Sequence, residues 1–297
     1  MINVKAWIHA ARPRTLPLAF TSTLLGSLLA WQDKPFKLPV MLLGLLTTLF
    51  LQILSNLAND YGDSANGMDN DLRVGPDRAV QSGAIPLHSM LAGVVITAVL
   101  ALASGLLLIA YGFDFQIKTG GFLFLLLGIT ALAAAIKYTV GKNPYGYIGY
   151  GDLFVFIFFG LTGVLGTYFL HTGIFYTALL LPASAVGLLS TAVLNLNNMR
   201  DREGDAVSGK RTLVVIIGIG PARIYHFILI IAAWLCFIIY RLMHSEHPLQ
   251  WLFLITLPFF IMHLRKVYTV STPAALDPEL KKLAISTLIT SVIFGIF

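Results

Sequence analysis

The chain has 297 residues, of which 57% are hydrophobic and only 11% are charged. A soluble domain carries roughly 25% charged residues, so this composition excludes an ordinary soluble protein and indicates an integral membrane protein. The single cysteine, Cys236, lies inside an apolar segment, which excludes a disulfide framework.

Nine segments are apolar over about the 20 residues that a membrane-spanning helix needs. Their hydrophobic runs are continuous and do not alternate, which predicts helices and not the strands of a barrel. The predicted spans cover residues 13–31, 38–58, 89–111, 119–138, 152–170, 174–197, 223–241, 249–266 and 282–297. We therefore expect an all-α integral membrane protein, a single domain over 1–297, whose nine transmembrane helices form a bundle around a central cavity. Residues 1–12 are expected to form an interfacial amphipathic segment before the first span.

The lysines and arginines predict the orientation of these spans. If the N-terminus is cytoplasmic, 16 of the 20 basic residues lie on the cytoplasmic side. The positive-inside rule therefore places the N-terminus and the loops after the even-numbered spans in the cytoplasm. We expect a multi-pass protein of the cell (inner) membrane whose active site faces the cytoplasm. The net charge of +6 then reflects topology, and we expect no nucleic-acid partner.

Acidic residues are rare and concentrated at the ends of two predicted spans. Of 14 in the chain, five lie between residues 60 and 77 and three between 201 and 205. Seven of these eight, all except Asp77, belong to two motifs, at 56–71 and 195–205, in which Asn and Asp recur four residues apart. That spacing places side chains on one face of a helix. The oxygen donors of the two motifs are Asn59, Asp60, Asp63 and Asp69 in the first, and Asn197, Asp201 and Asp205 in the second. Such oxygens suit Mg²⁺, which binds one or two carboxylates together with waters and substrate phosphates.

Basic residues follow both motifs and predict an anionic ligand. Arg73 and Arg78 come after the first motif, where they either neutralise its carboxylates or, with metal present, help to bind phosphate. Lys210 and Arg211 come after the second motif. Mg²⁺ ions can bridge a diphosphate to aspartates while Lys and Arg bind the remaining charge. A site of this kind among apolar helices predicts a substrate with a diphosphate head and a long hydrocarbon tail, such as an allylic polyprenyl diphosphate. Metal and cations would stabilise the departing diphosphate, and an electron-rich acceptor would attack the allyl cation.

Two segments have more than one interpretation. Arg12 and Arg14 either anchor the first span or contact a bound acidic substrate, and the tyrosines of 138–150 form either an interfacial belt or an aromatic-lined pocket. Residues 277–282 are interpreted as a solvated connection.

Two other protein classes use acids in membranes. Secondary transporters place carboxylates along ion pathways, but usually near the bilayer midplane, whereas these acids lie at helix ends. A membrane phosphotransferase would show an Asp-Gly…Ala-Arg run, which the chain lacks.

Three stretches carry a resemblance to a known family. They are Asn59-Asp60-Tyr61-x-Asp63-x-x-x-Gly67-x-Asp69, Arg73-x-Gly75-Pro76-x-Arg78-x-x-Gln81-Ser82-Gly83, and Asn197-Asn198-x-Arg200-Asp201-x-Glu203-x-Asp205-x-x-x-Gly209-Lys210-Arg211-Thr212-Leu213. Together with the segments around Arg12 and 138–152, they resemble the UbiA-type intramembrane prenyltransferase superfamily over nearly the whole chain. The pattern is most similar to the branch that prenylates 1,4-dihydroxy-2-naphthoate in menaquinone synthesis. Gly204 replaces a polar residue often found before the last Asp of the second motif.

The resemblance implies a nine-helix fold and a Mg²⁺-dependent reaction. The polyprenyl chain would be transferred to the naphthoate with loss of CO₂, giving demethylmenaquinone and diphosphate. Spacing alone does not exclude another aromatic acceptor, such as 4-hydroxybenzoate or a haem or chlorophyll precursor.

The resemblance also assigns roles to residues. The catalytic residues would be Asp63, Asp201, Lys142 and Tyr138, the last two contacting the diphosphate. Substrate binding would involve Asn59, Arg73, Arg78, Asn197, Arg200, Lys210 and Arg211. The metal would be held by Asn59, Asp63 and Asp69 on one arm and by Asn197, Asp201 and Asp205 on the other, with Asp60 as an additional acid of undefined role.

Overall fold

The computed structural model describes residues 3–33, 35–68, 74–75, 78–116 and 119–297, and over these residues the protein is helical, without strands. The longer helices are α1 (Val4–Ala11), α2 (Leu16–Asp33), α3 (Leu38–Ala65), α4 (Leu87–Gly112), α5 (Thr119–Lys137), α7 (Gly163–Thr172), α8 (Leu180–Val207), α10 (Ile219–His244), α11 (Leu257–Thr269) and α12 (Asp277–Ile296). The short helices are α6 (Gly151–Val155) and α9 (Leu213–Ile217), and a π-helical segment, Phe156–Thr162, joins α6 to α7. Single 3₁₀ segments lie at Pro13–Thr15, Tyr145–Ile148, Thr177–Leu179, Pro248–Thr256 and Pro273–Leu276.

Seven of the nine predicted spans correspond, among the residues described, to helices that are long and apolar enough to cross a membrane. The remaining two predictions, 13–31 and 282–297, fall on α2 and α12, which are helical but less apolar. Serines and threonines lower the mean hydropathy of α2, and the first turn of α12 contains Asp277 and Glu279. That α2 and α12 also cross the bilayer stays a prediction.

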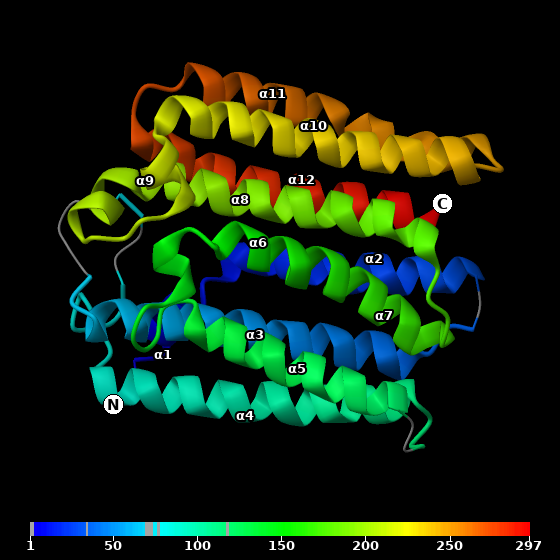
Figure 1. Ribbon diagram of the computed structural model, residues 1–297, viewed down its shortest axis with the longest axis horizontal. Helices are drawn as coiled ribbons and strands as arrows, with labels where there is room; N and C mark the ends of the chain where they lie inside the picture. Colours follow the sequence, from blue (N-terminus) through cyan, green and yellow to red (C-terminus); the bar gives the residue numbers. More distant parts are fainter. Residues whose placement is uncertain (1–2, 34, 69–73, 76–77, 117–118) are drawn as a thin grey trace.

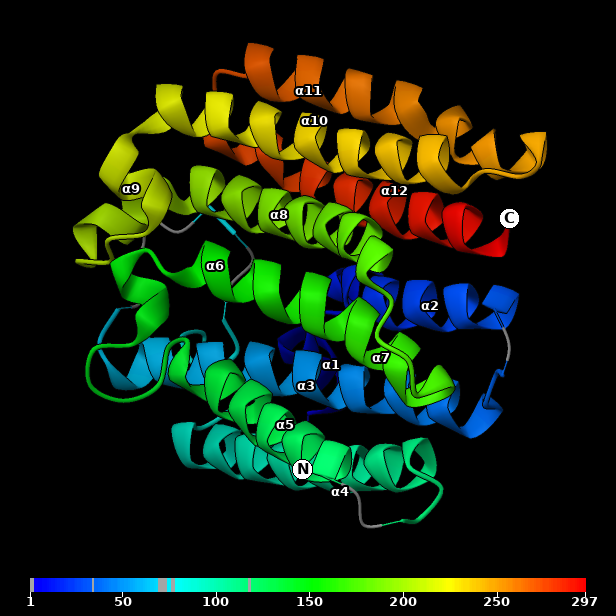
Figure 2. The ribbon, with the colours of Figure 1, turned by 45° about the vertical axis from the view of Figure 1, so that its right-hand side comes forward.

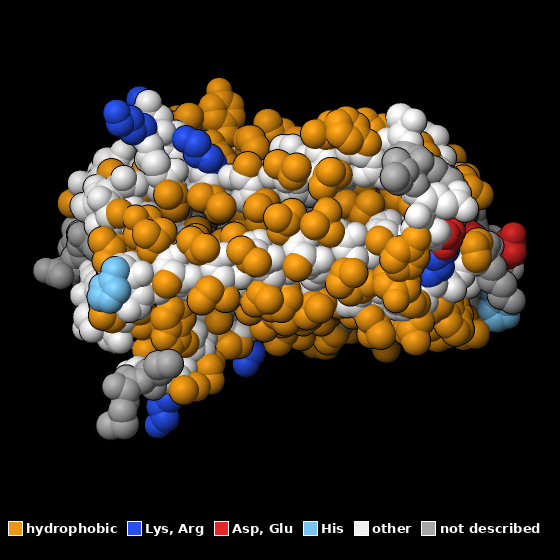
Figure 3. All heavy atoms as spheres, turned by 90° about the horizontal axis from the view of Figure 1, so that it is seen from below, with side chains coloured by type: hydrophobic (Ala, Val, Ile, Leu, Met, Phe, Trp, Pro, Cys, Tyr) orange, Lys and Arg blue, Asp and Glu red, His pale blue; other side chains and the backbone are white. Residues whose placement is uncertain are grey.

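The long helices run side by side and form a bundle (Figures 1 and 2). Helices α3, α4 and α5 lie together on one side with α1, and one hydrophobic cluster of buried side chains holds them. A second cluster joins α2, α7, α8, α10, α11 and α12. On the face shown in Figure 3, hydrophobic side chains cover the middle of the molecule and charged ones lie toward its two ends. The surface therefore suits a bilayer around the middle of the bundle.

Two helices extend beyond their predicted spans, and this extension carries the polar motifs. Helix α3 continues to Ala65, and the chain then turns at Gly67, whose φ of 67° favours glycine. Helix α8 continues to Val207 before a similar turn at Gly209. Both helix ends lie at the same end of the bundle, the end at which α9 packs against α8 (Figure 1).

A close approach of backbones joins the π-helical segment to α8. A Cβ atom added at Gly160 would lie 2.6 Å from the Gly187 Cα and 2.7 Å from the Ala183 carbonyl oxygen. Because both neighbours are backbone atoms, the helices must separate to accept it.

We therefore expect Gly160→Ala to lower the thermal unfolding midpoint of the purified protein, at a cost of about 1–3 kcal/mol for overpacking. The control is Gly220→Ala, because a Cβ there meets no atom within 4 Å. Equal unfolding midpoints for the two variants would contradict this packing.

Candidate active site

A cavity of about 430 Å³ lies between the two hydrophobic clusters. Its lining combines apolar side chains of α2, α5 and the α6–α7 run with polar side chains at the ends of α3 and α8. Eight of the predicted site residues line it: Asn59, Asp63, Arg78, Tyr138, Asn197, Asp201, Asp205 and Lys210. The structure therefore brings residues of both Asp motifs to one cavity.

The first arm of the site comes from the last turns of α3. Asn59 and Asp63 are four residues apart and both line the cavity, as the helical spacing predicts. The Asp63 carboxylate is buried and accepts a hydrogen bond from Lys210 Nζ at 2.7 Å. It also forms an ion pair with Arg78 and accepts a hydrogen bond from the Tyr147 hydroxyl. Two cations and one phenol thus surround a single carboxylate.

Tyr147 stays protonated in this setting. Burial raises the pKa of its phenol above the ordinary value, and the negative charge of Asp63 raises it further. The tyrosine can therefore act only as a hydrogen-bond donor toward Asp63 at physiological pH.

Asp60 faces the loop that follows the first motif. Its carboxylate accepts hydrogen bonds from the backbone N–H groups of Ala79 (2.9 Å) and Val80 (3.3 Å). These bonds hold the turn that begins with Arg78. Asp60 is buried there and does not line the cavity, so the structure gives it a role in placing Arg78.

The second arm comes from the extended end of α8. Asn197, Asp201 and Asp205 all line the cavity, spaced four residues apart. Asp201 accepts hydrogen bonds from Arg200 Nε at 2.9 Å and from Arg200 Nη2 at 2.7 Å. Lys210 Nζ lies 3.9 Å from an Asp205 oxygen and therefore stands between the two arms.

Three more predicted site residues that the structure describes are not part of the cavity wall. Arg200 is fully buried behind the second arm, whereas Lys142 and Arg211 are exposed at the surface. Asp69 and Arg73 lie outside the described residues.

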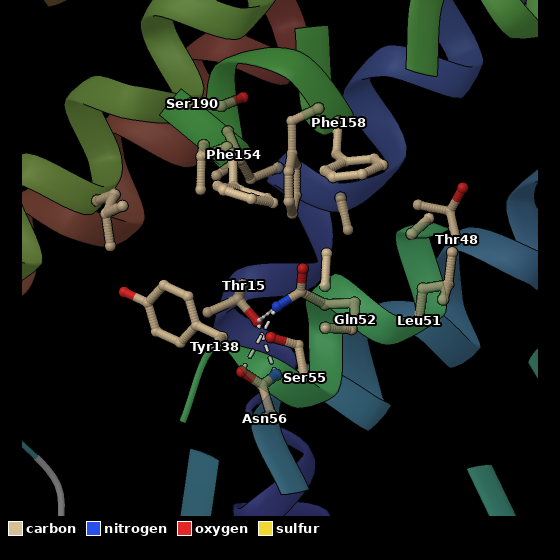
Figure 4. A pocket seen from close by; sticks show the side chains of 18 of the residues that line it. Thr15, Thr48, Leu51, Gln52, Ser55, Asn56, Tyr138, Phe154, Phe158 and Ser190 are labelled. Atoms are coloured by element: carbon tan, nitrogen blue, oxygen red, sulfur yellow. Dashed lines mark hydrogen bonds between the residues drawn. The ribbon is translucent and has the colours of Figure 1, made fainter. Parts of the chain in front are cut away.

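A second polar group lines the same cavity beside the N-terminal segment. Thr15 Oγ1 accepts hydrogen bonds from Gln52 Nε2 and from Asn56 Nδ2, each at 3.2 Å (Figure 4). Asn56 Nδ2 also donates to the Ala11 carbonyl oxygen at 2.9 Å. Figure 4 shows the aromatic rings of Phe154 and Phe158 across the cavity from this group. The chamber thus has an apolar aromatic wall facing a polar one.

The donor chemistry of the two arms fits Mg²⁺. Their cavity-lining atoms are carboxylate and amide oxygens, which this ion prefers. Among the residues described, no group of three or more acidic, His or Cys side chains is close enough to bind a metal without help. The arrangement suits an ion whose remaining ligands come from substrate phosphates and water.

Sequence reasoning missed two residues. Tyr147 belongs to the tyrosines that the sequence assigns either to an interfacial belt or to an aromatic-lined pocket, and only the fold shows that it contacts Asp63. Asp277, interpreted as part of a solvated connection, instead receives hydrogen bonds from Arg14 and Arg200. Contacts this distant in the chain leave no periodic signal in the sequence.

The role of Asp60 can be measured by hydrogen exchange. We expect Asp60→Ala to speed exchange of the 79 and 80 amides by roughly 10-fold, because burying a donor without a partner costs about 1–3 kcal/mol. Asp60→Asn retains one acceptor oxygen and should have a smaller effect. Asp114→Ala, at the other end of the bundle, should leave the exchange rates of these two amides unchanged. Unchanged exchange rates in Asp60→Ala would contradict the hydrogen bonds between Asp60 and these amides.

Comparisons with known proteins identify the family. The sequence profile of the UbiA prenyltransferase family matches residues 19–286. The chain is 44% identical to the 1,4-dihydroxy-2-naphthoate octaprenyltransferase of Escherichia coli, over 99% of this chain and 96% of the relative. It is 43% identical to the enzyme of the same name from Haemophilus influenzae, over 100% and 97%.

Solved structures share the fold at lower identity. The apo structure of a UbiA homolog from Aeropyrum pernix superimposes with a TM-score of 0.68 at 19% identity, covering 97% of this chain and 98% of the homolog. A UbiA homolog from Archaeoglobus fulgidus bound to GPP and Mg²⁺ gives 0.60 at 16% identity, covering 97% and 99%. The helical bundle, the paired Asp motifs and these matches agree: the chain belongs to the UbiA prenyltransferase family.

Proposed function

We propose that this protein transfers a polyprenyl chain from an allylic diphosphate to 1,4-dihydroxy-2-naphthoate in a Mg²⁺-dependent reaction. The observation that carries the proposal is the convergence of two Asn–Asp arms and two cations on one largely apolar cavity. The names of the 44% and 43% identical relatives support the naphthoate as acceptor. The Archaeoglobus homologs solved with Mg²⁺ and with DMAPP or GPP support the other substrate and the ion.

The diphosphate would bind where the two arms meet. Asn59 and Asp63 on one side, and Asn197, Asp201 and Asp205 on the other, would hold Mg²⁺, with Asp69 added to the first arm by resemblance. When bound, Mg²⁺ would offset the negative charge that develops on the departing diphosphate. Arg78 and Lys210 would bind the phosphate oxygens, because both line the cavity beside Asp63. The geometry favours these two over the exposed Lys142 and Arg211.

The reaction breaks the allylic C–O bond, and its electron pair leaves with the diphosphate. The ring carbon of the acceptor that carries the carboxylate then forms a bond to the allyl carbon, and loss of CO₂ restores the aromatic ring. The product is the quinol form of demethylmenaquinone. Phe154 and Phe158 line the cavity and would shield the allyl cation from water, together with Tyr138.

The acceptor would bind on the polar wall formed by Thr15, Gln52 and Asn56. Arg12 and Arg14 line the cavity on this side and would attract an acidic aromatic substrate. 4-Hydroxybenzoate also carries a carboxylate that these two arginines would attract, so it is the alternative acceptor for the same reaction. An ion-coupled transporter is the more remote alternative.

The proposed location is the cell (inner) membrane, with nine spans, a cytoplasmic N-terminus and the site facing the cytoplasm. The distribution of basic residues supports this orientation, since 16 of 20 fall on one side. The fold adds support, because the ends of α3 and α8 lie at one end of the bundle.

The test uses membranes from cells that express the chain, supplied with 1,4-dihydroxy-2-naphthoate and a radiolabelled allylic diphosphate. We expect lipid-soluble product with Mg²⁺ and none with EDTA. Asp63→Asn and Asp201→Asn should each lower the rate by at least about 100-fold, because each removes a charged ligand from one arm. The control is Asp114→Asn, whose carboxylate pairs with Lys37 at the far end of the bundle.

Two outcomes would change the proposal. Turnover with 4-hydroxybenzoate and none with the naphthoate would replace the acceptor and keep the chemistry. Metal-independent turnover, or full activity in both Asn variants, would overturn the two-arm site.

A further inference from the structure

Asp277, the first residue of α12, lies between two arginines from distant parts of the chain. Arg14 Nη1 donates to its two carboxylate oxygens at 3.1 and 3.2 Å. Arg200 Nη1 donates to Oδ1 of the same carboxylate. Asp277 is about one-third exposed, whereas Arg200 is only 1% exposed. Neither Asp motif includes Asp277, and its contacts are not those of a solvated loop.

Arg200 is shared between Asp277 and the second arm. Its Nε and Nη2 atoms bind both oxygens of Asp201, and Nη2 also donates to Asn197 Oδ1 at 2.9 Å. One guanidinium therefore contacts two side chains of the proposed metal arm on one edge and Asp277 on another. This use of a rigid donor fork is specific to arginine.

The position of this guanidinium is fixed by packing as well as by hydrogen bonds. A Cβ atom added at Gly75 would lie 2.6 Å from Arg200 Nη2 and 3.0 Å from its Cζ. Gly75, which follows the first motif, thus packs directly on Arg200. Arg200 has little room to move, so its charge has to be balanced where it stands.

We propose that Asp277 is a positioning residue for the second metal arm, which it serves by acting as the other counter-ion of Arg200. The proposal rests on the proposed function, because it assigns Asp201 to a Mg²⁺–diphosphate complex. Arg200 and a cation compete for the electron density of the same Asp201 oxygens. Asp277 offsets part of the positive charge of Arg200 and so leaves Asp201 better able to bind a divalent cation.

Two physical effects both predict that loss of the Asp277 charge lowers the metal affinity of the second arm. Removing the Asp277 charge makes the surroundings of the second arm more positive, which disfavours a cation at short range in a buried site. It also releases one edge of Arg200, which orients Asp201, and loss of such an outer contact typically lowers metal affinity by about 10–100-fold. Both effects weaken metal binding at the second arm.

The experiment measures metal binding directly, without turnover. Purified full-length protein in detergent is titrated with Mn²⁺ in the presence of inorganic diphosphate, and free Mn²⁺ is followed by electron paramagnetic resonance. We expect Asp277→Asn to raise the dissociation constant of Mn²⁺ by about 10-fold. Asp277→Glu keeps the charge and should stay within about twofold of wild type, and Asp114→Asn should match wild type. Thermal unfolding of each variant is measured in parallel.

Three results would contradict the inference about Asp277. Wild-type affinity in Asp277→Asn would overturn the inference and leave the proposed function untouched. Equal loss of Mn²⁺ binding in the Asn and Glu variants, with equal loss of thermal stability, would show that Asp277 has only a structural role. That result would also overturn the inference. Absence of diphosphate-dependent Mn²⁺ binding in the wild type would instead count against the metal site of the proposed function, and the inference would fail with it.

Discussion

The structure depends on how an apolar bundle accommodates buried carboxylates. An ionised acid removed from water is costly unless opposite charges and hydrogen-bond donors surround it. Asp63 meets this requirement with Lys210, Arg78 and Tyr147, and Asp201 meets it with Arg200. Arg200 is the chain neighbour of Asp201, but Tyr147 and Lys210 reach Asp63 from far along the chain. The acids therefore determine which parts of the fold must meet at this end of the bundle.

These pairs tie the two hydrophobic clusters together. Lys210 follows α8 and reaches across to Asp63 at the end of α3, so the second motif neutralises the first. In the opposite direction, the loop at Gly75, which follows the first motif, packs on Arg200 of the second. Arg14, before α2, is joined to α12 through Asp277. Each arm thus has a contact from the part of the chain that carries the other arm, which keeps both arms on one cavity.

The sequence predicted the features that have a local signal. Hydropathy located the helices, and the four-residue spacing placed Asn59 with Asp63 and Asn197 with Asp201 and Asp205 on shared faces that the structure confirms. The apolar spans end at residues 58 and 197, but the spacing of the Asn and Asp residues predicts that both helices continue, as α3 does to Ala65 and α8 to Val207. Tyr147, Asp277 and the turn-binding role of Asp60 depend on contacts between distant residues. No periodicity encodes such contacts, so they required the fold.

The same counter-ions can serve the protein with and without its proposed ligands. In the structure, Arg78 and Lys210 neutralise Asp63, so a buried acid has partners before any metal binds. If a divalent cation took over the Asp63 oxygens, these two side chains would lose their carboxylate and would stand beside a cavity that then holds a diphosphate. Phosphate oxygens are suitable replacements, because Arg and Lys bind them with charge-assisted hydrogen bonds. With this exchange, Asp63, Arg78 and Lys210 would each keep a partner of opposite charge in both states, which would allow an apolar bundle to keep the proposed polar site open.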